Sequence, residues 1–127
     1  MSQHRKHRGY SSQRIVADYL AAHGWPYAES TGAGRAGSDV TGAPGLDIEV
    51  KARRGFNPAA AMKQQAERSH PGDLAFAVLR LDGQGPAVIE DWPVVIRFGA
   101  FVEVLRDAGW GSPMPSGYSP DATDNRP

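Results

Sequence analysis

Residues 74–81 form a nearly unbroken apolar run, Leu-Ala-Phe-Ala-Val-Leu-Arg-Leu, which ends at the turn-forming residues 83–86. A strand that is apolar at successive positions, rather than at alternate ones, is covered on both of its faces. This run therefore predicts the central strand of a sheet with helices on both sides. Hydrophobic residues make up 40% of the 127 residues, which is enough for one core of modest size. We expect a single domain over residues 1–110.

The segments around this run alternate between helical and extended patterns. Ser11 and Ser12 are candidate caps for a helix over residues 12–23, and Asn57 with Pro58 opens a helix over residues 58–68. This order predicts an α/β fold in which a central mixed β-sheet is flanked by helices, with a parallel crossover around the helix at 58–68. The other predicted elements are short strands at 25–30 and 39–41, an alternating strand at 46–53, an interrupted strand region at 87–98, and a helix at 100–108 with Phe101, Val104 and Leu105 inward.

Charge is unevenly distributed along the chain, although the formal net charge is zero. Residues 1–68 hold ten of the 14 Lys and Arg residues and six of the 14 acids, a balance of +4, whereas residues 69–127 have a balance of −4. Residues 1–10 form a basic arm, which we expect to be disordered until a polyanion orders it; a solvated terminus is the alternative. The tail at 111–127 has too little apolar content to fold.

The composition excludes several classes of site. The chain has no cysteine, so it has no disulfide framework and no thiolate metal site. The Gly-rich loop at 31–38 lacks the Lys-Ser/Thr ending of a phosphate-binding loop, so we expect no nucleotide cofactor. No apolar run is long enough to span a membrane and no signal peptide is evident, which predicts a cytoplasmic protein. Any metal must bind to carboxylates, imidazoles or backbone oxygens, which favours Mg²⁺.

Residues 37–51, Gly-Ser-Asp-Val-Thr-Gly-Ala-Pro-Gly-Leu-Asp-Ile-Glu-Val-Lys, carry the candidate chemistry. Hydrolysis of a phosphodiester needs a cation that polarises the phosphate and binds water, and a positive group that steadies the nucleophile or the developing charge. Asp39, Glu49 and Lys51 supply two carboxylates and an amine. Glu49 and Lys51 share one face of a strand, a little under ~7 Å apart. Glu-x-Lys alone is a weak signal, because an exposed edge strand often alternates charged with apolar residues.

Asp39 can join this site only if its strand pairs with residues 46–53 in the right register. Opposite Asp47 or Glu49, its side chain shares their face; opposite Ile48, it points away. A three-residue loop between the two strands gives the productive pairing. A four-residue loop without a compensating bulge would count against the site.

The order of helix, Gly/Ser-rich loop, Asp39, turn and Glu49-Val-Lys51 resembles the PD-(D/E)xK nucleases, and especially the small Holliday junction resolvases of archaea and similar phage-encoded proteins. The resemblance covers about residues 9–81. It implies a restriction-endonuclease-like α/β sandwich in which Asp39 and Glu49 bind Mg²⁺ or Mn²⁺ and Lys51 assists the attacking water. It also implies a homodimer that acts on four-way DNA junctions.

The sequence departs from this family pattern at two positions. Archaeal resolvases usually carry a Glu early in the first helix, where this chain has Gln13. Glu29 is a candidate replacement for that metal ligand, and a solvent-facing residue is the alternative. Ser38 precedes Asp39 in place of the proline that gives the superfamily its name.

Residues near the site are candidates for supporting it or for contacting the DNA backbone. Asp47 shares the strand face of Glu49, and Gln65 lies on the helix that follows; an exposed strand residue and a surface glutamine are the alternatives. A group of basic residues brackets the site, and each is a candidate phosphate contact or a plain surface charge. This group comprises Arg5, Lys6, Arg8, Arg35, Arg53, Arg54 and Lys63.

These residues together predict a Mg²⁺-dependent, structure-selective DNA endonuclease, namely a dimeric Holliday junction resolvase. One alternative is a restriction or repair endonuclease acting on duplex or flapped DNA, because the catalytic core alone does not encode the shape of the substrate. The alternative outside enzymes is a non-catalytic DNA-binding module of the same fold. The apolar region at 92–105 is a hint of a dimer interface.

Overall fold

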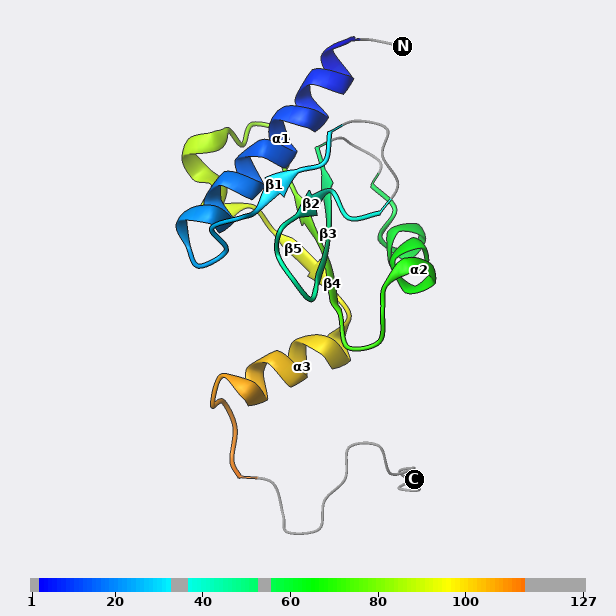
Figure 1. Cartoon of the computed structure of the whole chain (residues 1–127), viewed down its shortest axis with the longest axis vertical. Helices are drawn as coiled ribbons and strands as arrows, with labels where there is room; N and C mark the ends of the chain where they lie inside the picture. The colour runs from blue at the N-terminus through cyan, green and yellow to red at the C-terminus, as the bar shows by residue number, and fades with distance from the viewer. Residues whose placement is uncertain (1–2, 33–36, 53–55, 114–127) are drawn as a thin grey trace.

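The computed structural model describes residues 3–32, 37–52 and 56–113, with only the backbone described over residues 3–10. Helices and short strands alternate along the chain (Figure 1). In order, the elements are α1 (Gln3–Ala22), β1 (Glu29–Ser30), β2 (Val40–Thr41), β3 (Leu46–Lys51), α2 (Pro58–Arg68), β4 (Leu74–Leu79), the 3-10 helix η1 (Pro86–Asp91), β5 (Val94–Ile96) and α3 (Phe98–Asp107).

Strands β3, β4 and β5 form a mixed sheet with β4 at its centre. β3 and β4 are parallel, from Leu46 opposite Leu74 to Lys51 opposite Leu79, and β5 is antiparallel to β4. Parallel pairing needs a crossover, which α2 provides. The α/β fold and the central position of the apolar run are thus confirmed. The predicted central mixed sheet is present, but β1 and β2 are not part of it and form a separate antiparallel pair.

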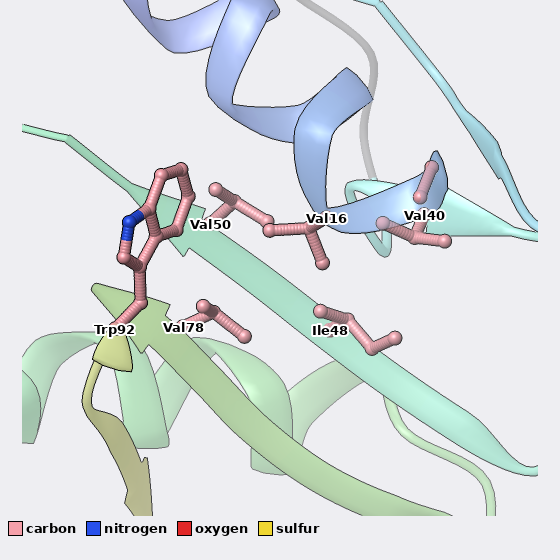
Figure 2. Close-up of a cluster of buried hydrophobic side chains, with 7 residues drawn as sticks. Val16, Val40, Ile48, Val50, Val78 and Trp92 are labelled. Atoms are coloured by element: carbon pink, nitrogen blue, oxygen red, sulfur yellow. The ribbon is translucent and has the colours of Figure 1, made fainter. Parts of the chain in front are cut away.

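The hydrophobic core lies between α1 and the sheet. Val16 of α1 forms one buried cluster with Ile48 and Val50 of β3, and the cluster extends to Val78 of β4 and to Trp92 (Figure 2). The alternation predicted for β3 explains this arrangement, because successive side chains of a strand point to opposite faces. The even-numbered residues of β3 enter the core, and the odd-numbered ones face α2.

Helix α2 has the predicted bounds, and its start has a local cause. The Asn57 side chain accepts a hydrogen bond from the amide of Ala60 at 3.1 Å, and Pro58 occupies the first turn. Such a cap stabilises a helix by about 1 kcal/mol. Ala61 and Gln65 are the buried residues of α2. The sheet therefore has a helix on each face, as its apolar central strand requires.

The ends of the chain bear on two further predictions. Helix α1 begins at Gln3, so the backbone of the basic arm is helical from that residue and the expected disorder is wrong there. The predicted Ser12 cap is also wrong, because Ser12 lies inside the helix, fully buried, and its hydroxyl accepts from Arg80. Residues 114–127 of the predicted tail lie outside the described residues. In the part of the chain that the structure describes, no helix combines the length and apolar character needed to cross a membrane.

The region after β4 differs most from the prediction. Within the strand region predicted over residues 87–98, the residues up to Asp91 belong to the 3-10 helix η1, and Val94–Ile96 form the strand β5. Of the three positions predicted to face inward in α3, Phe101 is 43% exposed, Val104 is 39% exposed and Leu105 is half-buried, and no residue of this helix is buried. Figure 1 shows α3 leading away from the sheet. This helix thus presents apolar side chains that the described part of the chain leaves exposed.

The turn between β2 and β3 requires glycine at one position. Gly42 has a φ of +77°, and a Cβ atom there would lie 1.9 Å from the carbonyl oxygen of Tyr27. Gly45, at the other end of the turn, also has a positive φ of +80° but has open space around it. The close approach at Gly42 holds the turn against the segment that leads into β1.

Candidate active site

The candidate site lies at the edge of β3 that faces away from β4. The carbonyls of Gly45 and Lys51 accept hydrogen bonds from the β4 side, so the amides of Ile48 and Val50 point to the opposite edge. Ser38 meets this edge with its side chain. Its hydroxyl accepts from the Ile48 amide at 3.0 Å and donates to the Val40 carbonyl at 2.7 Å.

Asp39 is bonded to the same edge through both its backbone and its side chain. Its amide donates to the Ile48 carbonyl at 2.8 Å, and its Oδ2 atom accepts from the Val50 amide, also at 2.8 Å. Side-chain oxygens of Ser38 and Asp39 therefore stand where a backbone ladder would otherwise form. The carboxylate of Asp39 is held beside Val50, which lies between Glu49 and Lys51 in the strand.

The three-residue loop required for the productive pairing is absent, although Asp39 bonds to β3. Four residues, 42–45, separate β2 from β3, which is the loop length that counts against the site in a regular ladder. The backbone of Asp39 also lies beside Ile48, the position expected to turn its side chain away. That expectation assumed a regular ladder, and no ladder joins Asp39 to β3. Because the side chain bonds to the strand edge itself, the alternation of faces does not decide where its carboxylate lies.

Glu49 and Lys51 form an ion pair on the face of β3 that α2 covers. The Nζ atom of Lys51 lies 3.5 Å from Oε2 of Glu49, and the other oxygen, Oε1, lies 2.6 Å from Nη1 of Arg68. The side chain of Glu49 is buried, whereas that of Lys51 is 32% exposed. The shared strand face predicted for Glu49 and Lys51 is thus confirmed, and the amine of Lys51 remains accessible.

The pKa of Asp39 is raised to about 6, chiefly because burial penalises its charged form. The Val50 amide opposes this shift by hydrogen bonding, the negative charge of Glu49 adds to it, and the positive charges of Lys51 and Arg68 oppose it. Glu49, Lys51 and Arg68 therefore all contribute to the electrostatic environment of Asp39. A carboxyl group whose pKa is shifted by burial and by a second carboxylate is typical of functional sites.

Asp47 is a buried residue, and the interpretation of it as an exposed strand position is wrong. It is 5% exposed, and Arg68 at the end of α2 binds both of its carboxylate oxygens. The hydroxyl of Ser69 also donates to Oδ2 of Asp47. Burial opposes the charge of Asp47, but these hydrogen bonds outweigh burial and hold its pKa below the usual range. The hydrogen bonds to Asp47 in turn raise the pKa of Arg68, so this guanidinium stays charged.

Gln65 contacts the strand that carries Glu49, as expected of a supporting residue. Its Nε2 atom donates to the carbonyl of Asp47 at 3.1 Å and to the carbonyl of Phe76 at 2.9 Å. Gln65 is 3% exposed, so the alternative of a surface glutamine is wrong. It joins the backbones of β3 and β4 beneath the ion pairs and thereby supports the strand that carries Glu49.

Several predicted residues are not placed in this cluster. Glu29 is exposed on β1, and no group of three or more acidic or histidine residues that could hold a metal occurs among the described residues. Gln13 is half-buried, and its Oε1 atom is buried without a hydrogen-bond partner in the described part of the chain. Lys63 is exposed on α2. The other predicted DNA contacts, Arg35, Arg53 and Arg54 and the side chains of Arg5, Lys6 and Arg8, lie outside what the structure describes.

The donor set fits a small, hard cation. Asp39 and Glu49 offer carboxylate oxygens from two different segments, and the charge of Glu49 contributes to raising the pKa of Asp39. Mg²⁺ usually binds to one or two carboxylates, keeps several waters and takes its remaining ligands from substrate phosphates. Asp39 and Glu49 would be the two carboxylates of such a site, whereas a fully enclosed Ca²⁺ site needs more oxygen ligands than this pair provides.

Comparison with protein-family models, with curated proteins and with solved structures finds no match to this chain. The resemblance to PD-(D/E)xK nucleases therefore rests on the residues and their arrangement.

Two residues of the cluster were missed by sequence reasoning. Arg68 ends α2, where a basic residue is usual because it complements the helix dipole, so nothing marked it as special. The topology gives a signal that could have found it: α2 runs back along β3, so its last turn lies near the start of that strand. A buried Asp47 there needs a cation. Ser38 gave no comparable signal, because a serine in a Gly-rich loop is ordinary.

Proposed function

We propose that this protein is a metal-dependent DNA endonuclease with Asp39, Glu49 and Lys51 at its active site. The observation that carries the proposal is the position of these residues around Val50 of β3: Asp39, from a separate segment, bonds to the Val50 amide, and Glu49 and Lys51 are paired on either side of Val50 in the strand. The fold supports it, because a strand with this site is followed by a crossover helix and a buried parallel strand. A restriction-endonuclease-like sandwich belongs to the same proposal.

The chain's own residues divide the work of phosphodiester hydrolysis. Asp39 and Glu49 would hold the cation through carboxylate oxygens, and the pKa of Asp39 at about 6 leaves it ionised at neutral pH. When bound, Mg²⁺ polarises the phosphate and lowers the pKa of a bound water. Lys51 presents a partly exposed ammonium beside Glu49, where it can donate to a phosphate oxygen or to the attacking water. The Val50 amide keeps the Asp39 carboxylate in place.

Within this function, we propose the four-way DNA junction as substrate and a homodimer as the active form. Both come from the resemblance to the small resolvases. The dimer has independent support from the exposed apolar side chains of β5 and α3, which include Val94, Phe98 and Phe101. Contiguous apolar surface of this kind marks interaction sites in monomeric folds. A second copy of the chain would place two active sites on one junction.

One observation favours a second candidate, a non-catalytic DNA-binding module. Arg68 and Lys51 both bind Glu49, and a third acidic ligand is not found within the described residues. This arrangement is also what a purely structural ion-pair network would show. In that case DNA binding would depend on the basic residues and would not require a metal.

Cleavage of a labelled four-way junction, a matched linear duplex and a flapped duplex tests the proposal. Each substrate is incubated with Mg²⁺ or EDTA, using the wild-type protein, Asp39→Asn, and the exposed control Asp18→Asn. Paired nicks in the junction alone, lost with EDTA and with Asp39→Asn but kept in the control, are expected. Cleavage of all three substrates would support the nuclease activity but contradict the proposed selectivity for junctions. Tight binding without cleavage in Mg²⁺ or Mn²⁺ would favour the non-catalytic module.

A further inference from the structure

Arg68 joins two carboxylates that lie on the same face of β3. Its Nε atom donates to Asp47 at 3.0 Å, its Nη2 atom binds the other oxygen of Asp47, and its Nη1 atom lies 2.6 Å from Oε1 of Glu49. Asp47 is held in addition by the hydroxyl of Ser69 and by burial. Because the guanidinium is planar, fixing two of its nitrogens on Asp47 also fixes the direction of the third.

In this geometry, one carboxylate oxygen of Glu49 is bound more closely than the other. Oε1 is bound by Arg68, and Oε2 lies 3.5 Å from the ammonium of Lys51, beyond the usual length of a charged hydrogen bond. The Glu49 side chain is only 7% exposed, so it has little room to rotate. The oxygen that remains for a further ligand is therefore Oε2, on the side of Lys51.

We propose that Arg68 is a positioning residue that orients Glu49 so that Oε2 is offered to the metal. This inference rests on the proposed nuclease function. Arg68 acts through Glu49, and Asp47 acts through Arg68. Because Arg68 lies at the end of α2 and is fixed by Asp47, the orientation of Glu49 depends on where α2 ends.

A purely structural role for Arg68 makes a different prediction. If Arg68 only neutralises two buried carboxylates, any cationic side chain of similar length that keeps the fold should also keep the metal affinity. Lysine carries the same charge, but it cannot hold Asp47 through two nitrogens and direct a third at Glu49. Arg68→Lys therefore changes the geometry while it keeps the charge, and metal affinity separates the two roles.

The experiment measures Mn²⁺ binding to the full-length protein by calorimetry, and the half-saturating Mg²⁺ concentration for junction cleavage. The wild-type protein is compared with Arg68→Lys and with the control Glu67→Gln, an exposed neighbour on α2. Residues that orient metal ligands typically change metal affinity or activity by about 10-fold to 100-fold when they are mutated. We expect Arg68→Lys to weaken Mn²⁺ binding and to raise the half-saturating Mg²⁺ by about 10-fold, with junction affinity in EDTA unchanged.

A second variant keeps the test decisive if Arg68→Lys does not fold. Asp47→Asn retains a hydrogen-bond acceptor for Arg68 but removes the negative charge that holds it. This variant should also weaken Mn²⁺ binding, by a smaller factor than Arg68→Lys. Metal affinity equal to that of the control in the folded variants would overturn the positioning role alone, because wild-type cleavage would still support the nuclease. A wild-type protein that binds neither Mn²⁺ nor Mg²⁺ would overturn the nuclease and the positioning role together.

Discussion

Replacing Asp39 with asparagine should abolish cleavage and, at the same time, stabilise the fold. The carboxylate of Asp39 is half-buried beside Glu49, and its pKa is raised from 3.8 to about 6 mainly by burial. Charging this group therefore costs free energy in the folded protein. Asparagine has no charge and can still accept the hydrogen bond of the Val50 amide. Under the proposed function, the charge of Asp39 would serve to bind the metal, and the metal-free protein would carry this cost.

The size and pH dependence of the effect follow from the shift. About two pKa units correspond to about 3 kcal/mol, and solvent screening of a half-buried group reduces this to about 1–2 kcal/mol. Because the folded-state pKa lies above the unfolded one, the protonated group contributes stability that is fully present below pH 3.8 and is lost as the pH rises through about 6. Asp39→Asn should therefore be more stable than the wild type at pH 8, and the advantage should shrink towards pH 4.

Urea unfolding in EDTA at pH 8 and at pH 4.5 measures this difference. The matched control is Asp18→Asn, which removes an exposed carboxylate from α1 and should leave the stability at both pH values within about 0.5 kcal/mol of the wild type. An Asp39→Asn variant without added stability at pH 8, or with the same advantage at both pH values, would refute the reasoning.

Three further predictions concern other parts of the fold. Gly42→Ala should lower the free energy of unfolding by about 2–4 kcal/mol because of its positive φ and the carbonyl of Tyr27, whereas Gly45→Ala should cost about 1 kcal/mol; equal losses in urea unfolding would contradict the steric cause. Gln13→Met removes a buried amide oxygen without a partner in the described residues and should leave Tm unchanged or raise stability by about 1 kcal/mol; a clear drop in Tm would show that the amide is needed by the fold. Phe101→Asp should give a monomer by sedimentation at micromolar protein with Tm retained, and a wild-type protein that is itself a monomer would remove the proposed dimer.

The elements that could be predicted are those whose signals are local. The apolar run of β4, the alternation of β3 and the cap of α2 at Asn57 each depend on neighbouring residues, and the structure has all three. The proximity of Glu49 and Lys51 followed from the same alternation. That Asp39 joins them was also predicted, although the assumed reason, a regular ladder, was wrong. The chemistry of the three residues stays a prediction.

What could not be predicted depends on contacts between distant segments. The burial of Asp47 follows from the return of α2 along β3, which brings Arg68 and Ser69 onto its carboxylate. The exposure of α3 depends on how the helix packs against the rest of the fold, which its own amphipathic pattern does not show. The helical backbone of residues 3–10 continues a helix that tertiary packing stabilises further along, and the local polar composition does not reveal it.

The side chains of Ser38 and Asp39 also protect the protein against self-association. A strand edge with free amides is a template for pairing with another chain, and these two residues occupy the amides of Ile48 and Val50 at the open edge of β3. Alanine at either position would leave one of those amides without its side-chain acceptor. The exposed strand edge could then pair with another chain. An inactive protein made with Asp39→Ala should therefore aggregate more readily than one made with Asp39→Asn, because the residue proposed for catalysis also terminates the sheet.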